Sequence, residues 1–469
     1  MRTTSSEVLI ELDRSRPRGL RAQVEDELRS AIRSGRLAPG TSLPSSRALS
    51  GDLGVTRGVI VAAYDQLIAE GYLLSRHGSG TVVNATGQGA VRRSPQPSES
   101  VPVIVDFRPG LPDLDLFPRA AWLRATRVAL QTVPRDDLGY TDPRGLLPLR
   151  QALADYLARV RGVSADPDHV VVCNGFGHGF SLLAAVLRDL GHDVVAIEDP
   201  GYDGPLEVLA ASGARHRAIP VDADGLVVDQ LRRSGARAVV VTPAHQNPTG
   251  AVMSPARRTA VVAWARSVDG YVIEDDYDAE YRYDRHPAGA IQGLDPERVI
   301  YCGTTSKSLA PGLRLGWLVV PRDLVDPIVA ARRATDRATS SFQQATYAAF
   351  LARGDLDRHL RRTRRIYRQR RDALISALAR WFPAAMPCGA SAGLHVLVTL
   401  PEDLHEGVLA ELALEAGVRV YPLNDYRASR RSDHAPGLVL GYGQLTAAQL
   451  EHGARVLSEV AASARGSVG

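Results

Sequence analysis

The chain contains a single lysine, Lys307, although lysine and arginine together number 56 among its 469 residues. A desolvated lysine amine can lose its proton and attack a carbonyl carbon, whereas a guanidinium stays charged and does not react in this way. Uniqueness alone fits a surface accident of composition equally well. What chemistry Lys307 can perform is therefore decided by the residues around it.

Groups suited to a doubly charged phosphate flank Lys307 in the stretch TTSKSLAPGLRLGW. Thr304 and Ser306 offer hydroxyls, and Arg314 offers a guanidinium seven residues after the lysine. Charge-assisted hydrogen bonds from such groups are strong ones in phosphate recognition. The stretch therefore predicts a reactive amine beside a phosphate-binding site.

A second phosphate cradle is predicted upstream, in the sequence VVVCNGFGHGFSLLAAVL. A glycine-rich turn there joins an apolar strand to an apolar helix, so the amides of Phe176 and Gly177 are expected at the start of that helix. The N-terminus of a helix presents unpaired N–H groups to an anion. Glycine turns between a strand and a helix are common, so this stretch gains weight only together with Lys307.

Four further residues supply the groups that a pyridine cofactor needs around its ring. A carboxylate beneath the ring nitrogen keeps the ring an electron sink, and Asp275 in VIEDDYDAEYRY is the residue predicted to supply it. Tyr277 and Asn247 are predicted at the phenolic oxygen, and Tyr202 on the ring face. Each residue has an ordinary structural explanation by itself. Their joint appearance at successive strand ends favours a cofactor site.

The elements that must position these residues are short apolar runs that alternate with helical patterns over about 360 residues. Near-continuous apolar strands of this kind predict a mostly parallel sheet covered on both faces, the α/β fold class. Ligands of such sheets bind beyond the carboxyl ends of the strands. The strand-like runs are 169–173, 193–198, 237–243, 271–276, 298–303 and 314–320.

The N-terminal segment has a different pattern, which predicts three helices and a hairpin. An amphipathic helix is predicted over Leu20 to Ser34, a second helix after Ser45 and a third after Thr56, because serine and threonine are favoured N-caps. The sequence YLLSRHGSGTVVN then predicts two strands joined at RHGSG. This succession indicates a winged helix-turn-helix.

Charge supports a nucleic-acid partner for this segment. From Arg14 to Arg93 there are 12 arginines and six acidic residues, whereas the whole chain carries a net charge of only +4. A solvated basic face without a partner, or a winged helix used only for protein contact, remain the alternatives. In the DNA-reading geometry the second helix of the pair meets base edges and the wing tip meets backbone or minor groove. The predicted DNA contacts are Arg47, Thr56, Arg57, Arg76, His77 and Gly78.

Composition indicates where the chain divides into domains and in which compartment the protein is expected. The segment 86–104 is rich in Gly, Pro, Ser and Gln and predicts a flexible linker between a winged helix-turn-helix at 14–85 and a large domain at 105–469. Three scattered cysteines and no C-x-x-C pair argue against a disulfide framework or a zinc site, and no metal ligands are predicted. No apolar stretch is long enough for a membrane span and no targeting signal is evident, so a cytoplasmic protein is expected.

Two resemblances follow from these motifs. The segment LPSSRALSGDLGVTRGVIVAAYDQLIAEG resembles the GntR family of bacterial repressors. The region from about residue 106 onward, with YTDPRGLLPLRQALADYLARVRG, NPTG, EDDYDAEYRY and TTSKSLAPGLRLGW in register, is similar to the aminotransferases of fold type I. Together they resemble the MocR (GabR-like) regulators, in which a winged helix-turn-helix is fused to an aminotransferase-like domain with large and small subdomains.

This resemblance implies a cofactor, a partner and a role. It implies a transcriptional regulator that uses pyridoxal 5'-phosphate, carried covalently by Lys307, and that senses this cofactor or an amino compound. It also implies a head-to-tail homodimer in which Tyr140 reaches the phosphate across the dimer. The expected protein is thus a DNA-binding regulator with at most a partial transamination half-reaction.

The sequence departs from the aminotransferase pattern where the substrate carboxylate is held. The segment 435–445 contains no arginine, and Gly204 stands where the GABA-responsive member has one. Arg427, Arg430 and Arg431 are candidates to replace it, although nothing in the sequence places them. Two alternatives stay open: an active aminotransferase with an accessory DNA-binding domain, and a fold that has lost its cofactor.

Overall fold

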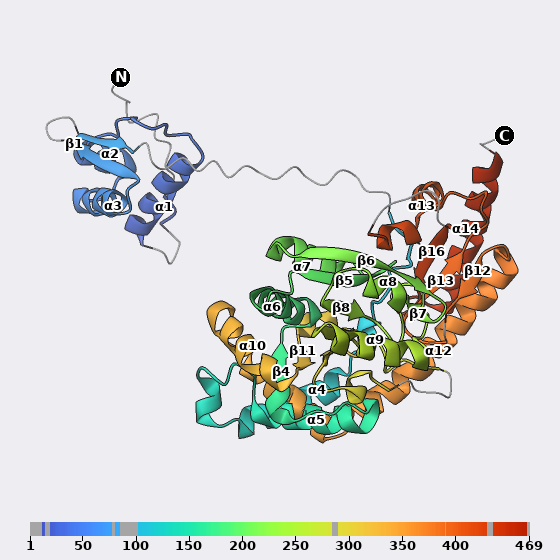
Figure 1. Ribbon diagram of the computed structural model, residues 1–469. Helices are drawn as coiled ribbons and strands as arrows, with labels where there is room; N and C mark the ends of the chain where they lie inside the picture. The colour runs from blue at the N-terminus through green and yellow to red at the C-terminus, as the bar shows by residue number, and fades with distance from the viewer. Residues whose placement is uncertain are drawn as a thin grey trace. The chain divides into compact units, whose positions relative to one another are not determined.

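A computed structural model describes residues 12–14, 19–76, 80–84, 102–283, 289–389, 391–428 and 435–466. The chain divides into two compact units, Met1–Ser100 and Val101–Gly469 (Figure 1). Most of the segment predicted as a linker lies outside the described residues. Its last residue, Ile104, donates a backbone hydrogen bond of 2.8 Å to the Gly417 carbonyl and so belongs to the second unit.

The first unit contains the three helices and the hairpin predicted for a winged helix-turn-helix. The side chain of Ser45 accepts a hydrogen bond from the amide of Ala48 and so caps the second helix, whereas Thr56 precedes the third helix without a side-chain cap. Val24, Leu28 and other apolar residues of the helices form its small core. The elements are α1 (Leu20–Arg33), α2 (Ser46–Leu53), α3 (Arg57–Ala69), β1 (Leu73–Arg76) and β2 (Gly80–Val83), and β1 pairs with β2 antiparallel.

An eight-stranded sheet forms the centre of the second unit, in the order β4-β11-β10-β9-β8-β5-β6-β7. Five adjacent strands are parallel to one another: β10, β9, β8, β5 and β6. The strand β11 is antiparallel to both β10 and β4. The predicted α/β class with a mostly parallel sheet is confirmed. The strands are β4 (Val170–Cys173), β5 (Val194–Asp199), β6 (Arg215–Asp222), β7 (Gly225–Leu226), β8 (Ala238–Val241), β9 (Tyr271–Asp275), β10 (Val299–Thr304) and β11 (Gly316–Val319).

Alternating side chains of these strands pack into separate cores on the two faces of the sheet. In β9, Tyr271 and Ile273 belong to one apolar cluster and Val272 to another. Because both faces are covered, each strand is apolar at nearly every position, as its sequence indicated. The helices of this part are α4 (Arg119–Thr132), α5 (Leu147–Arg161), α6 (Phe176–Asp189), α7 (Gly204–Ser212), α8 (Val228–Arg232), α9 (Pro255–Ser267), α10 (Arg322–Thr335) and α11 (Ser341–Ala352).

A second, smaller sheet follows near the C-terminus, with the antiparallel order β12-β13-β16-β15. Figure 1 shows it beside the helices coloured orange and red. The short strand β3 (Val105–Asp106) crosses from the start of the unit to pair with β14 (Val418–Arg419). The other elements here are α12 (Asp355–Trp381), β12 (Met386–Cys388), β13 (His395–Thr399), α13 (Glu406–Glu415), β15 (Tyr421–Pro422), β16 (Gly437–Gly441) and α14 (Ala447–Gly466).

None of the described helices combines the length and the hydropathy that a membrane crossing needs.

Candidate cofactor and effector site

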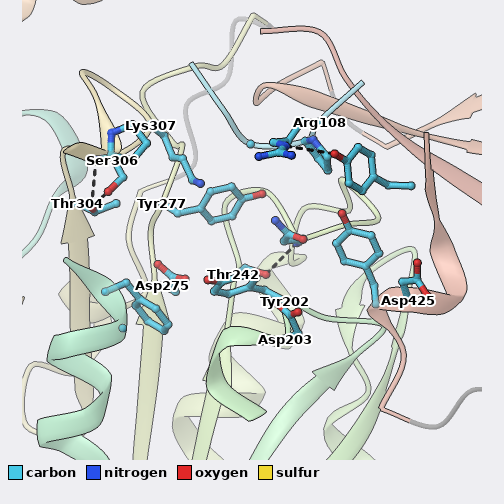
Figure 2. A pocket seen from close by; sticks show the side chains of 18 of the residues that line it. Arg108, Tyr202, Asp203, Thr242, Asp275, Tyr277, Thr304, Ser306, Lys307 and Asp425 are labelled. Carbon is cyan, nitrogen blue, oxygen red and sulfur yellow. Dashed lines mark hydrogen bonds between the residues drawn. The ribbon is translucent and has the colours of Figure 1, made fainter. Parts of the chain in front are cut away.

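A cavity of about 730 Å³ opens at the carboxyl ends of the central strands (Figure 2). Asp275 ends β9 and Thr304 ends β10, so the parallel register of these two strands brings both side chains to one edge of the sheet. Residues from the small sheet close the opposite side. The cavity is lined by Arg108, Pro109, Gly110, Phe176, Gly177, Tyr202, Asp203, Thr242, Asn247, Asp275, Tyr277, Thr304, Ser306, Lys307, Pro311, Arg314, Tyr421, Asp425 and Tyr426.

The amine of Lys307 points into this cavity from the turn after β10 (Figure 2). Burial lowers the pKa of this amine, and the nearby carboxylates of Asp278 and Asp275 oppose that shift. Gly110 has φ of +68°, and a Cβ added there would lie 3.3 Å from Lys307 Nζ. A glycine at this position therefore leaves room for the amine, and a depressed pKa favours its neutral, nucleophilic form.

Asp275 is a buried carboxyl with an unsatisfied oxygen. Its Oδ1 has no hydrogen-bond partner among the described residues. Burial raises the pKa of Asp275 well above its ordinary value, Asp276 adds to the rise, and Lys307 opposes it. A buried polar atom without a partner is costly unless a ligand supplies one. A protonated ring nitrogen would supply a donor and a positive charge.

Tyr277 and Asn247 lie side by side above the sheet. The Tyr277 hydroxyl donates to the His245 carbonyl over 3.0 Å, and the His245 Nδ1 lies 3.1 Å from the same oxygen. Burial raises the pKa of this hydroxyl, and a hydrogen bond from the Asn247 side chain opposes the rise. The Asn247 Oδ1 is buried and unpaired among the described residues. Both residues thus hold hydrogen-bonding capacity directed at the cavity.

A buried polar cluster of His245, Asp278 and His395 lies next to Tyr277 and contacts its hydroxyl through His245. The ligand-type atoms of these three residues lie within 4.8 Å of one another, and His245 Nδ1 is 3.0 Å from Asp278 Oδ2. Burial lowers the pKa of His395 to about 3, so this ring is neutral. The three residues come from separate segments of the chain, and no metal site was predicted from the sequence.

Two groups of residues form the predicted phosphate cradle. Thr304 Oγ1 donates to Ser306 Oγ over 2.9 Å and accepts from the Ser306 amide, which fixes both hydroxyls at the end of β10. Arg314, later in the same turn, has a φ of +47°. A Cβ added at Gly175 would lie 3.6 Å from Arg314 Nη1. The guanidinium therefore lies within van der Waals range of the turn at Gly175.

That turn is the N-terminus of a 14-residue helix. Gly175, with φ of +91°, precedes α6, and Phe176 and Gly177 are its first two residues. No side chain among the described residues caps this end, so the first amides of the helix can bind an anion. Hydroxyls, guanidinium and helix N-terminus meet at one end of the cavity and provide the donors that a phosphate accepts.

Tyr202 and Tyr140 differ in their placement. Tyr202 lines the cavity and is 46% exposed, and a Cβ at Gly204 would lie 2.4 Å from its ring. Any side chain at position 204 would therefore clash with the Tyr202 ring in this position. Tyr140 does not line the cavity of this chain: it is 91% exposed, and the guanidinium of Arg337 lies 5.4 Å from its ring centroid.

Arg108 is the main cavity residue that the sequence analysis missed. It follows β3, more than 150 residues before Lys307 in the chain, and the motif FRPG gave no sign that this segment reaches the sheet edge. Its Nε donates to the Tyr421 hydroxyl over 3.2 Å. Arg427, one of the expected replacements for the missing carboxylate arginine, does not line the cavity. The other two, at 430 and 431, lie outside the described residues.

The predicted DNA contacts lie around α2 and α3. Arg47, Thr56 and Arg57 are exposed, and Arg57 Nε donates to Ser46 Oγ over 3.3 Å. Arg76 ends β1, and its side chain is not described. His77 and Gly78 lie outside the described residues. The exposed arginines stand at the starts of two helices, where phosphate groups are readily bound.

Comparisons with known proteins separate the same two regions. Residues 20–83 match the family of bacterial regulatory proteins, gntR family, and residues 109–457 match aminotransferase class I and II. An archaeal alanine:glyoxylate aminotransferase superposes with a TM-score of 0.70, at 27% identity over 76% of this chain and 91% of its own. The multiple substrate aminotransferase from Thermococcus profundus also gives 0.70, at 26% identity over 79% and 93%.

Two regulators match across both regions at once. The probable rhizopine catabolism regulatory protein MocR of Rhizobium meliloti is 34% identical over 95% of this chain and 94% of its own length. The pyridoxine biosynthesis transcriptional regulator PdxR of Corynebacterium glutamicum is 34% identical over 92% and 94%. Both alignments span the gntR match and the aminotransferase match of this chain. The chain therefore belongs to the MocR-type transcriptional regulators of the gntR family, whose DNA-binding domain precedes an aminotransferase class I and II domain.

Proposed function

We propose that this regulator binds pyridoxal 5'-phosphate covalently at Lys307 and changes its DNA binding in response to the cofactor or to an amino compound. The observation that carries the proposal is one cavity in which the only lysine of the chain has a lowered pKa and faces a buried carboxyl, Asp275, with an unpaired oxygen. The cofactor supplies an aldehyde and an electron-withdrawing ring. The chain supplies the amine, the counter-charge and the donors around them.

The remaining groups divide into two sets in this proposal. Asp275 pairs with the ring nitrogen, Tyr277 and Asn247 meet the phenolic oxygen, and Tyr202 covers the ring face. The phosphate is held at the other end of the cavity. The phosphate set is Thr304, Ser306, Arg314, Phe176 and Gly177, joined by Tyr140 of a second copy in a head-to-tail homodimer.

A domain arrangement with a flexible connection completes the proposal. Residues 14–85 bind double-stranded DNA, the part of 86–104 that precedes the second unit acts as a linker, and 105–469 hold the cofactor. Binding at two separate sites is coupled when a ligand favours one arrangement of the domains over another. The proposed DNA contacts are Arg47, Thr56, Arg57, Arg76, His77 and Gly78.

Lys307→Ala and Lys307→Arg form a matched pair that tests the cofactor assignment. The arginine variant keeps the positive charge but has no nucleophilic amine, so both variants are expected to lose the visible absorbance of lysine-bound cofactor. After borohydride reduction of the wild-type protein, mass spectrometry should find the cofactor on the peptide that contains Lys307. Unchanged absorbance in either variant, or a trapped cofactor on another residue, contradicts the proposal.

The regulatory part is tested by binding to the DNA that lies next to its own gene. Affinity and footprint are measured for the wild-type protein without cofactor, with cofactor, and with cofactor plus candidate amines, and again for Lys307→Ala. We expect the wild-type footprint to change and that of the variant to stay constant. An identical wild-type footprint under all conditions refutes sensing. Repeated turnover of an amino acid with a keto acid would instead favour an active aminotransferase.

A further inference from the structure

We infer that Arg108 binds the carboxylate of the effector, so that the amino compound sensed by this protein is a zwitterion with one carboxylate. This inference rests on the proposed function, since it concerns the part of the same cavity that the cofactor leaves free. Arg108 thereby becomes the partner of the ligand carboxylate, because the segment 435–445 lacks the arginine that aminotransferases use for it.

Three cationic side chains of the described residues line the cavity: Lys307, Arg314 and Arg108. The proposed cofactor engages the first two, one with its aldehyde and one with its phosphate. Arg108 comes from the segment after β3, on the side of the cavity that faces the small sheet (Figure 2). It is therefore the one of these three cations to which no anionic group of the cofactor has been assigned.

Arg108 is held in place by its neighbours without being saturated by them. Its Nε donates to the Tyr421 hydroxyl over 3.2 Å, and that hydroxyl donates in turn to Asp106 Oδ1 over 2.9 Å. Asp106 Oδ2 lies 3.6 Å from Arg108 Nη2, an ion pair too long for a hydrogen bond. Neither Nη atom donates a hydrogen bond within the described part of the chain. A guanidinium fixed through Nε with both Nη groups available suits a carboxylate.

The position of Arg108 along the backbone ties it to the reactive amine. Gly110 is two residues later, and a Cβ there would lie 3.3 Å from Lys307 Nζ. Two peptide units span at most about 7 Å, so the backbone that carries Arg108 lies close to the point at which an incoming amine meets the cofactor. A ligand amine at Lys307 thus places a carboxylate of a small amino acid within reach of this guanidinium.

Two further charged residues of the cavity lining limit the net charge that a ligand can carry. Asp203 and Asp425 also line the cavity and disfavour a ligand with excess negative charge. One carboxylate opposite Arg108, balanced by one amine, fits this arrangement better than a dicarboxylate or a simple amine. The expected class is a small monocarboxylic amino acid.

Titration of the cofactor-loaded full-length protein tests this inference through its visible spectrum. The ligands are alanine, β-alanine and 4-aminobutyrate, with ethylamine and propylamine as the same amines without a carboxylate. In the wild-type protein at least one amino acid should bind more tightly than its matched amine. Arg108→Gln should weaken that amino acid by about 10- to 100-fold, the range for a hydrogen bond to a charged group, and leave the amines unchanged.

Three further variants distinguish an ionic contact from a structural role. Arg108→Lys keeps the charge and should restore part of the lost affinity, and Tyr421→Phe, which frees Nε, should give a smaller loss than Arg108→Gln. Arg427→Gln should change nothing. If Arg427→Gln removes the discrimination instead, or if the wild-type protein binds amines and amino acids equally, the assignment of Arg108 is wrong.

Failure of the proposed function has a different signature. Cofactor alone should give the absorbance of the lysine-bound form in both the wild-type protein and Arg108→Gln. If the wild-type protein lacks that absorbance, the cofactor proposal fails, and this inference fails with it. If the absorbance is present but Arg108→Gln binds the amino acids as the wild-type protein does, only the inference about Arg108 is overturned.

Discussion

In the first unit, no carboxyl or guanidinium group is buried among the described residues, whereas the second unit buries many such groups around its sheet. The charges of the first unit lie at its surface and pair there, as Arg29 does with Glu70. Burying a charge is costly, so a fold retains such groups where they pair with one another or meet a ligand. The difference follows from the two tasks: DNA phosphates are met at a surface, and a cofactor is met in a desolvated cavity.

Neighbouring aspartates at the end of β9 show that burial alone does not identify a ligand site. Asp276 is fully paired: Arg161 donates to its two oxygens over 2.7 and 3.0 Å, and Tyr301 donates over 2.7 Å. Asp275, one residue earlier, keeps an oxygen without a partner among the described residues. The first forms a structural ion pair, and the second is the carboxyl that we propose to pair with the cofactor.

The largest expected effect is a loss of stability in one unit only. A cavity created in the core of either unit should leave the other unit folded. Leu28 in the first unit and Leu183 in the second are both fully buried. Each substitution to alanine should cost about 2–5 kcal/mol, but only in its own unit. Leu28→Ala should abolish DNA binding and keep cofactor binding, and Leu183→Ala should destabilise the second unit instead.

Tryptophan fluorescence separates the two outcomes, because all four tryptophans of the chain follow residue 120. In urea, Leu28→Ala should shift an early part of the circular dichroism transition and leave the fluorescence transition of the second unit unchanged. Leu183→Ala should shift the fluorescence transition to lower urea. A single transition that both variants shift together would mean that the units unfold as one.

How far the sequence could go also differs between the two units. In the first, a helix cap such as Ser45 acts on an amide three residues away, so local patterns sufficed for the elements. In the second, Asp275 and Thr304 were identifiable because each ends an apolar strand. Arg108 at the cavity and His395 next to Tyr277 were not, since the pairing of distant strands brings their segments there. Tyr140 was suggested by resemblance alone.

The second prediction sharpens the contrast in buried charge through pH. Glu198 lies beneath the cavity, where its Oε2 accepts from the amide and hydroxyl of Thr242, and burial raises its pKa to about 7. A carboxyl with a raised folded-state pKa binds its proton more tightly in the folded protein. It therefore contributes stability below its unfolded-state pKa, and that contribution is lost as pH rises through about 7.

Glu198→Gln should accordingly flatten the fall in stability of the second unit between pH 5 and pH 8. The full contribution of such a shift is on the order of 3 kcal/mol. Urea unfolding followed by tryptophan fluorescence at several pH values measures it, with the exposed Glu402→Gln as the control that should keep the wild-type slope. A Glu198→Gln slope equal to the wild-type slope would show that this carboxyl is ionised in the folded protein.

The smallest predicted effect belongs to the surface of the first unit. Arg57 is exposed at the start of α3 and is bound only by Ser46 Oγ over 3.3 Å among the described contacts. If it contacts a phosphate, its removal should lower the slope of log affinity against log salt by about 0.9 and weaken binding to all sequences alike. If it reads a base, Arg57→Ala should instead reduce the preference for the operator over random DNA, by about 1–3 kcal/mol, with a smaller change in slope.

Arg21→Ala is the matched control for this measurement, because Arg21 is equally exposed but pairs with Glu25 within α1. It should leave both the slope and the preference unchanged, since a surface ion pair contributes little and its loss removes no phosphate contact. Equal effects of the two substitutions would mean that the basic charge of the unit acts as a diffuse field. A larger effect at Arg57 would locate the DNA at the start of α3, where an exposed guanidinium can act without any of the burial that the cofactor cavity requires.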